Sequence, residues 1–169
     1  LFNASSSNVN KINDDIELKK GIAFCVKKIS EGILNGGCLF VAGNGGSAAD
    51  SQHFVAEFIS KLSKDRDPIK AISLTVDTSV ITAIGNDYGF ENVFSRQLEA
   101  LININDIFIA ITTSGKSRNI LQGIKKAKEK GATTIMLTGK KQQQPNTNCD
   151  LTIKAPGETT AEIQETHLI

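Results

Sequence analysis

Residues 107–121, IFIAITTSGKSRNIL, run from an unbroken apolar segment into a loop of hydroxyls and glycine, and then into a helical pattern. The apolar run 107–111 is typical of a strand that is buried on both faces. The pattern that follows predicts a helix over 120–130. A buried strand that continues through a short polar loop into a helix is the repeating unit of a parallel α/β sheet.

The same unit recurs along the chain. Further short apolar runs predict strands at 38–42, 71–74, 133–137 and 151–153. Helical patterns separate them at 48–62, 79–85, 93–101 and after Thr159, whose hydroxyl could form a capping box with Glu162. The polar stretch 140–148 is expected to be a surface loop. The alternation predicts a doubly wound α/β fold, with helices covering both faces of a parallel sheet.

The N-terminal part of the chain differs from this pattern. Apolar residues recur at helical spacing from Val9 to Leu34, which predicts one long helix. There is no internal repeat and no linker, so we expect residues 1–169 to form a single domain, with a helical segment at 1–35 and an α/β core at 36–169. The helical pattern still continues at Ile169, and we expect the C-terminal helix of the gene product to be longer.

Composition and charge exclude several classes of protein. Nineteen basic and eighteen acidic residues give a net charge of +1, which predicts neither a nucleic-acid-binding nor a membrane-binding surface. No apolar stretch approaches the length of a membrane span, and no signal peptide is visible. The three cysteines are widely spaced and odd in number. They indicate a reduced, cytoplasmic protein.

Two polar loops follow predicted strands. Gly43–Ser47 comes after the strand at 38–42, and Thr112–Ser117 comes after the strand at 107–111. In an open α/β sheet, ligands bind beyond the carboxyl ends of the strands, where helix N-termini favour phosphate. Either loop alone could be a tight turn with a helix cap. Two such loops in one short domain favour a phosphate-bearing ligand.

The first of these loops also fits a dinucleotide-binding pattern. Residues 43–48, GNGGSA, match GxGxx(G/A). The acidic residue expected about twenty positions further on is missing, because Asp77 lies too late in the chain. A nicotinamide enzyme is therefore the less favoured reading of the loop.

A His–Glu pair lies on the helix that begins at the first loop. His53 and Glu57 are four residues apart and project from one face, and Lys61 is expected to continue that stripe. An exposed pair of this kind usually contributes little. Here the helix starts at a ligand loop, so the pair could supply a base that removes a proton next to a carbonyl. His and Glu can also hold a metal, and Gln164 and His167 are candidates for further ligands.

Four segments together resemble the phosphoheptose isomerase (sedoheptulose 7-phosphate isomerase) family of SIS-domain proteins. They are AGNGGSAADSQHFVAEF (42–58), DTSVITAIGNDYGFENVFSRQLEAL (77–101), ITTSGKSRNIL (111–121) and AEIQETH (161–167). The resemblance implies a three-layer α/β/α sandwich around a five-stranded parallel sheet. It also implies a bacterial, cytoplasmic homotetramer with the long N-terminal helices at the subunit interfaces.

The resemblance also implies an activity and a site. Sedoheptulose 7-phosphate would be converted to D-glycero-D-manno-heptose 7-phosphate, the first step toward nucleotide-activated heptose for bacterial surface polysaccharide. Glu57 matches the acid/base, and the zinc ligands, for one zinc per subunit, would be His53, Glu57 and Gln164. The substrate-binding positions would be Asn44, Gly45, Gly46, Ser47, Glu57, Asn86, Asp87, Thr112, Thr113, Ser114, Ser117 and Gln164.

Two departures from the family pattern matter. The family has a catalytic and metal-binding His about two helical turns past Gln164, and we expect the chain to continue past Ile169 and supply it. His167 is too close to Gln164 to take that role. Lys61 stands where the family usually has an Arg that reaches the substrate phosphate of a neighbouring subunit. Lys supplies the charge but not the planar fork of donors.

Two other functions remain as alternatives. Non-catalytic SIS proteins that bind the bacterial replication initiator share the glycine loop and the AxIQExH segment, but lack a carboxylate at the position of Glu57. A sugar-phosphate sensor would usually be fused to a DNA-binding module, for which this chain has no room. Glu57 is therefore the residue that favours the enzyme.

Overall fold

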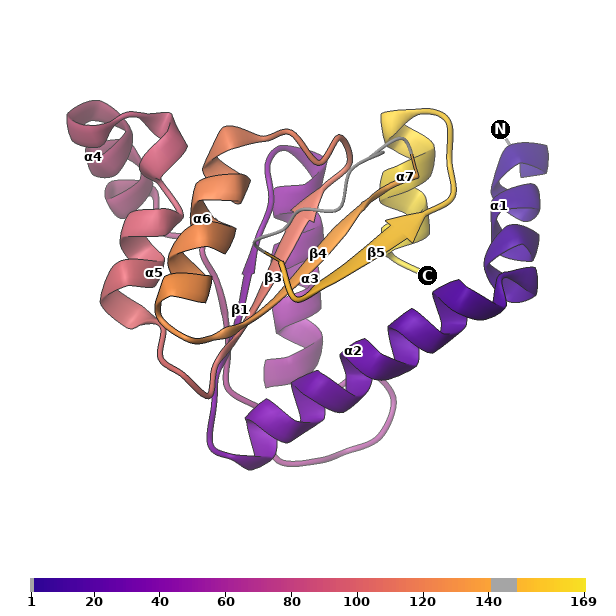
Figure 1. Ribbon diagram of the computed structural model, residues 1–169, viewed down its shortest axis with the longest axis horizontal. Coiled ribbons are helices and arrows are strands. Elements are labelled where there is room, and N and C mark those ends of the chain that lie inside the picture. Colours follow the sequence, from indigo (N-terminus) through magenta and orange to yellow (C-terminus); the bar gives the residue numbers. More distant parts are fainter. Residues whose placement is uncertain (1, 141–148) are drawn as a thin grey trace.

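The computed structural model describes residues 2–140 and 149–169 (Figure 1). The predicted loop at 140–148 falls, apart from Lys140, outside the described residues. The elements in chain order are α1 (Phe2–Asp14), α2 (Ile16–Leu34), β1 (Leu39–Ala42), α3 (Gly46–Ile59), β2 (Ala71–Ser73), α4 (Thr78–Tyr88), the 3₁₀ helix η1 (Phe90–Asn92), α5 (Ser95–Leu101), β3 (Ile107–Thr112), α6 (Arg118–Glu129), β4 (Thr133–Gly139), β5 (Leu151–Ala155) and α7 (Thr160–His167).

The five strands form one sheet in the order β2-β1-β3-β4-β5, and every neighbouring pair is parallel. The predicted α/β class and parallel five-stranded sheet are thus confirmed. All five predicted strands form within one or two residues of their expected ends. Their apolar runs were informative because a parallel sheet with helices on both faces buries both sides of each strand.

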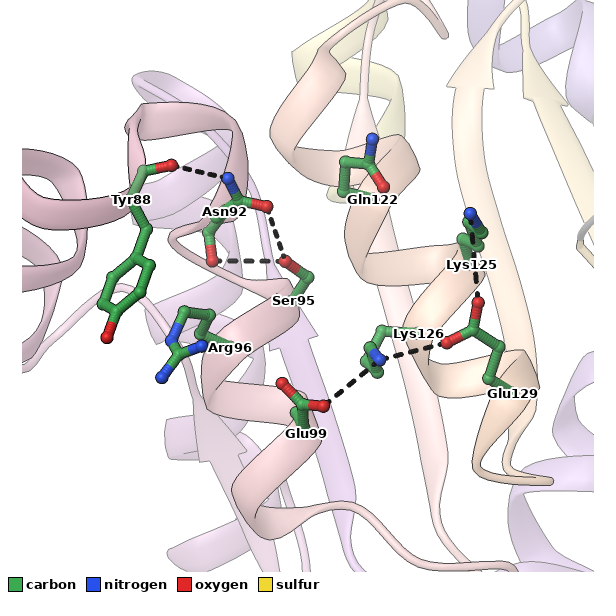
Figure 2. A pocket seen from close by; sticks show the side chains of 9 residues that line it. All are labelled: Tyr88, Asn92, Ser95, Arg96, Glu99, Gln122, Lys125, Lys126 and Glu129. Carbon is green, nitrogen blue, oxygen red and sulfur yellow. Dashed lines mark hydrogen bonds and ion pairs between the residues drawn. The ribbon is translucent and has the colours of Figure 1, made fainter.

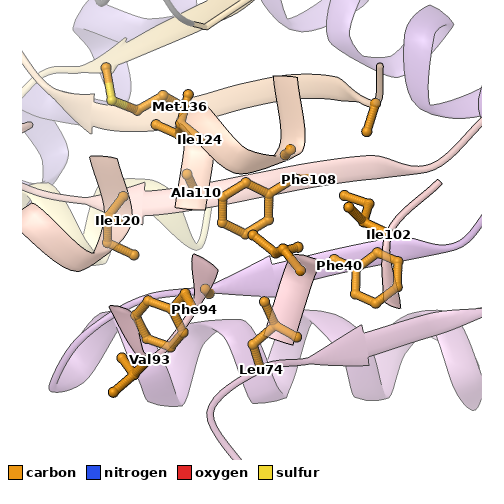
Figure 3. Packing of buried hydrophobic residues seen from close by; sticks show 14 residues of the cluster. Phe40, Leu74, Val93, Phe94, Ile102, Phe108, Ala110, Ile120, Ile124 and Met136 are labelled. Carbon is orange, nitrogen blue, oxygen red and sulfur yellow. The ribbon is translucent and has the colours of Figure 1, made fainter. Parts of the chain in front are cut away.

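The sheet lies between two helical layers, each with its own apolar core. Phe40 and Phe108 point to the face that α5 and α6 cover, where they pack with Ile120 and Met136 (Figure 3). The alternate strand residues, such as Ile109, point to the opposite face under α2 and α3. Successive side chains of a strand point to opposite faces, so the same strands serve both cores. The three-layer α/β/α architecture follows.

The predicted single N-terminal helix over 9–34 is wrong in one respect, because Asp15 divides it. Asp15 has an extended backbone, with ψ 97°, and its side chain accepts a hydrogen bond from the backbone N–H of Leu18 at 2.9 Å. This is an N-cap, which starts a new helix. The preceding helix α1 packs against α7, where the Ser5 hydroxyl donates to Glu165 at 2.8 Å. The N-terminal segment is therefore a pair of helices.

The C-terminal end of α3 also differs from the prediction. The helix ends at Ile59, three residues before the predicted end at Leu62, so Lys61 lies outside it and does not continue the His53–Glu57 stripe. Arg66 donates to the backbone carbonyls of Glu57 at 2.6 Å and Phe58 at 2.9 Å. A cation that binds the last carbonyls stabilises a helix end. The chain therefore turns away one residue after Ile59.

No helix in the described part of the chain is both long enough and apolar enough to cross a membrane.

Candidate active site

The candidate site lies where the direction of the strand order changes. β1 and β3 are neighbours, with Ala42 paired to Ala110, yet the helices that follow them cover opposite faces of the sheet. In this strand order, the crevice at the carboxyl ends of β1 and β3 is the place where ligands bind. The structure thus brings the two predicted loops, 43–47 and 112–117, to the same edge of adjacent strands.

The first loop is shaped by its glycines. Gly45 has φ 57°, a backbone conformation that favours glycine, and a Cβ on Gly43 would collide with the backbone of Ser47. Gly45 is the N-cap residue of α3, and no side chain caps the helix there. The loop therefore presents the positive end of the α3 dipole with no side-chain capping hydrogen bond from the described residues.

The second loop folds back on itself through its hydroxyls. The hydroxyls of Thr112 and Ser117 lie 3.1 Å apart, and the Ser114 hydroxyl accepts a hydrogen bond from the backbone N–H of Lys116. Gly115 has φ 66°, which lets the loop turn. Ser117 is the N-cap residue of α6, but its side chain makes no capping bond. Hydroxyls and a helix N-terminus whose N-cap side chain makes no capping bond are thus gathered in one loop, an arrangement that favours phosphate.

His53 and Glu57 face each other on α3 as predicted. The Nε2 atom of His53 lies 3.7 Å from Oε1 of Glu57, and the two side chains are 65% and 29% exposed. Asp50, one turn before His53, was missed by the sequence analysis. Burial raises the pKa of the Asp50 carboxyl, and the charge of His53 partly offsets this. Its Oδ2 atom is buried and has no hydrogen-bond partner within the part of the chain that the structure describes. Its spacing of three residues from His53 was the available signal.

Gln164 on α7 reaches the first turn of α3. A Cβ on Gly46 would collide with its side-chain nitrogen, so the glycine makes room for the amide. His167 does not join the His53–Glu57 pair: it faces an apolar cavity of about 290 Å³ under α2, with Nε2 3.3 Å from the carbonyl of Thr138. Burial lowers the pKa of His167. Of the two candidates on the final helix, only Gln164 lies at the loop.

Asn86 and Asp87 lie together on α4. Both are exposed, and the Asn86 amide donates to the Asp87 carboxylate at 2.7 Å. α4 has no fully buried residue and packs mainly against η1. Among the described residues, no hydrogen bond or ion pair joins these two side chains to either loop, and their role in binding stays a prediction.

A separate polar pocket of about 320 Å³ lies between α5 and α6 (Figure 2). Two of its three cations are paired with carboxylates: Lys125 contacts Glu129 at 4.0 Å, and Lys126 contacts both Glu99 at 3.4 Å and Glu129 at 3.0 Å. The third, the Arg96 guanidinium, lies 3.9 Å from the centre of the Tyr88 ring. Because the two carboxylates offset most of the positive charge, this pocket is a poorer anion site than the crevice.

The donor atoms of the site fit zinc only in part. An imidazole nitrogen and a carboxylate oxygen, as in His53 and Glu57, are ordinary zinc ligands. Within 2–140 and 149–169, no three His, Cys, Asp or Glu side chains lie close enough together to hold a metal. Gln164 could add an amide oxygen to the pair. Any remaining ligand would have to come from outside these residues.

The fold and the two loops define an SIS-domain protein, and the SIS domain family model matches residues 5–139. The chain is 49% identical to the phosphoheptose isomerase of Campylobacter jejuni subsp. jejuni serotype O:6, over 94% of this chain and 86% of that protein. It is 46% identical to that of Aneurinibacillus thermoaerophilus, over 98% and 84% of the two chains. The solved structure of a phosphoheptose isomerase from Francisella tularensis superposes with a TM-score of 0.90, at 36% identity, covering 99% of this chain and 88% of that one.

The chain belongs to the phosphoheptose isomerase family, a family of aldose–ketose isomerases. The resemblance stated from the four sequence segments is thus confirmed.

Proposed function

We propose that the protein isomerises sedoheptulose 7-phosphate to D-glycero-D-manno-heptose 7-phosphate. Similarity to phosphoheptose isomerases over most of the chain supports this activity. The observation that carries the proposal is the position of Glu57: a half-buried carboxylate, 3.7 Å from His53, on the helix that begins at the glycine loop. A carboxylate at this place can act on a sugar whose phosphate lies in the neighbouring loop.

The phosphate would bind at the start of α6. Thr112, Thr113, Ser114 and Ser117 supply hydroxyls and backbone groups there, and the uncapped helix end favours an anion. The sugar would extend from this loop over Asn44, Gly45, Gly46 and Ser47 toward Glu57. Asn86 and Asp87 are proposed as further substrate contacts on the strength of the resemblance alone.

Glu57 would move the proton. Its carboxylate removes a proton from C1 of the ketose, which gives an enediolate, and returns it to C2, while the hydroxyl proton of O1 is transferred to O2. The product is the aldose, and no atom is gained or lost. A positioned carboxylate of this kind typically contributes 10²–10⁴-fold to the rate. The nearby loops would also exclude water from the enediolate.

Zinc, one per subunit, is proposed as the cofactor, held by His53, Glu57 and Gln164. When bound, it would polarise the carbonyl of the substrate. Glu57 would then serve both as a ligand and as the proton carrier, a double role that the sequence resemblance implies.

A homotetramer is proposed as the working form. Several apolar side chains of α2 are exposed in the single chain, among them Phe24 at 46% and Val26 at 58%. Exposed apolar residues in this number on one helix are typical of an interface between subunits. We further propose a bacterial, cytoplasmic enzyme that supplies heptose for surface polysaccharide. The three cysteines are free, as in a reducing compartment.

The test is direct. Purified full-length gene product, supplied with zinc, is incubated with sedoheptulose 7-phosphate, and formation of the aldose is followed. We expect turnover that is lost in the presence of a zinc chelator and restored by zinc. Binding of the sugar phosphate without any turnover would instead favour a sensor or another non-catalytic SIS protein.

A further inference from the structure

Asn119, which the sequence analysis did not single out, makes the only side-chain hydrogen bonds between the first loop and the start of α6 in the described chain. Its Nδ2 donates to Oδ1 of Asn44 at 2.8 Å, and the Nδ2 of Asn44 donates back to Oδ1 of Asn119 at 2.9 Å. The Oδ1 of Asn119 also accepts from the backbone N–H of Ile120 at 2.9 Å. Asn119 is only 3% exposed.

The pair spans the crevice. Asn44 follows β1 and precedes α3, whereas Asn119 lies in the first turn of α6, which covers the opposite face of the sheet. A reciprocal pair of this kind requires a group that donates and accepts along the same edge, and a carboxamide does so without a change of protonation, whereas an ionised carboxylate only accepts. Each amide of the pair is held in one orientation, because reversing Asn119 would also break its bond to Ile120.

Asn44 is thereby fixed rather than free to turn. A carboxamide has two N–H donors and two lone pairs, and Asn44 uses one of each on Asn119. One donor and one acceptor remain for a ligand, and they point in directions that Asn119 sets. Because the pair is buried on the Asn119 side, breaking it would leave polar atoms without partners at a substantial cost.

We propose that Asn119 is a positioning residue, which acts through Asn44 to hold the glycine loop at a fixed distance from the phosphate loop. A ligand that contacts both loops, as a sugar phosphate does in the proposed function on which this inference rests, depends on that distance. Inorganic phosphate, which in the proposed function needs only the start of α6, does not.

The experiment compares Asn119→Ala with a matched control, Gln97→Ala. Gln97 is another buried amide, 9% exposed, with hydrogen bonds to the carbonyls of Leu74 and Val93, and it lies on α5 away from both loops. We measure kcat and KM for sedoheptulose 7-phosphate, and the inhibition constant of inorganic phosphate. For Asn119→Ala we expect kcat/KM to fall at least about tenfold, while the inhibition constant of phosphate stays within about twofold. Gln97→Ala should leave both parameters within about twofold.

A cycle with Asn44→Ala tests whether the two residues act as one unit. The double variant should be no worse in kcat/KM than the worse single variant, because either change alone breaks the pair. If Asn119→Ala does not fold, Asn119→Ser replaces it: its hydroxyl suits a helix start but is too short to reach Asn44.

Three results would overturn the inference. The first is a fall in kcat/KM of the double variant equal to the product of the falls in the two single variants. The second is a rise of KM and of the inhibition constant of phosphate by the same factor in Asn119→Ala. The third is a fall in kcat/KM of Gln97→Ala as large as that of Asn119→Ala. The proposed function fails separately, if the wild-type protein does not turn over sedoheptulose 7-phosphate. In that case the dissociation constants of the sugar phosphate and of inorganic phosphate, measured by calorimetric titration, are compared between the variants instead. If the wild type does not bind the sugar phosphate, both the proposed function and the inference about Asn119 are overturned.

Discussion

The side-chain amide of Gln164 rests against the Cα atom of Gly46, in the space that a Cβ would occupy. This contact joins the last helix of the chain to the first residue of α3. It explains why the loop has a glycine at a position whose backbone does not itself require one. It also gives a way to move Gln164 without removing it.

Gly46→Ala should displace Gln164 from the crevice. The new methyl group meets the far end of a flexible side chain, so we expect the melting temperature to change by only a few degrees, whereas kcat/KM falls by about 10²-fold because a proposed ligand is misplaced. Steady-state kinetics and thermal unfolding measure the two effects. In a Gln164→Ala background the same glycine substitution should cost no further activity; a full additional loss would show that Gly46 acts independently.

Glu57→Gln should separate binding from chemistry. The amide keeps the shape of the side chain but cannot take up the proton, so we expect kcat to fall by about 10³-fold. The dissociation constant of sedoheptulose 7-phosphate, measured by calorimetry, should change by less than about fivefold. Glu129→Gln, at the far end of α6, is the matched control. An active Glu57→Gln enzyme would remove Glu57 from the role of base.

His167 should make the stability of the protein depend on pH. Burial lowers its pKa below the ordinary value of 6.5, so the unfolded chain binds the proton more readily than the folded one. The stabilising contribution is therefore complete above about pH 6.5 and is lost as the pH falls toward the lower, folded-state pKa. Among the described residues, Cys25 is the only other titratable side chain that lines the cavity.

Urea unfolding at pH 7, 6 and 5 tests this. His167→Leu should show a smaller loss of the free energy of unfolding over this range than the wild type. His53→Gln removes the chain's other histidine, from an exposed position, and should keep the wild-type dependence. If the two variants show the same dependence, His167 is not its source.

Lys61→Arg should improve binding of the substrate. Lys61 lies past the end of α3, 4.0 Å from Asp65, and its side chain is 55% exposed. A guanidinium can form two parallel hydrogen bonds to a phosphate where an ammonium forms a point contact. One added bond of about 1 kcal/mol would lower KM about fivefold. Lys64→Arg, three residues further on, should leave KM unchanged. If KM is unchanged in both variants, the side chain of residue 61 does not contact the substrate phosphate.

Much of the fold could be predicted from the sequence, because the sheet is buried on both faces. Runs such as Ile107–Ile111 are apolar at every position, and this signal does not depend on the rest of the chain. The positions of the two polar loops followed from the same reasoning, since the end of a strand and the start of a helix are local features. The break at Asp15 was missed because the apolar spacing continues through it.

The contacts across the crevice could not be predicted in the same way. From its neighbours in the sequence, Asn119 is expected only to favour the start of a helix. Nothing near it in the sequence indicates that its side chain forms hydrogen bonds with Asn44. The hydrogen bonds of Arg66 to the end of α3 depend on how the chain turns after Ile59, which has no periodic pattern. His167 was already excluded from the catalytic and metal-binding role because it lies too close to Gln164 in the sequence, but its burial in the cavity under α2 is a result of packing between distant elements.

The position of β1 between β2 and β3 also affects how the chain is made. One edge of β1 pairs with β2, the next strand in the chain, but its other edge pairs Leu39 with Ile107 of β3, which is synthesised much later. At ribosomal rates of about 5–20 residues per second, this edge stays open for several seconds. During that time an entirely apolar strand exposes unpaired backbone groups, which is the condition for aggregation or chaperone capture. Whether the newly synthesised chain avoids aggregation therefore depends on how soon β3 pairs with the open edge of β1.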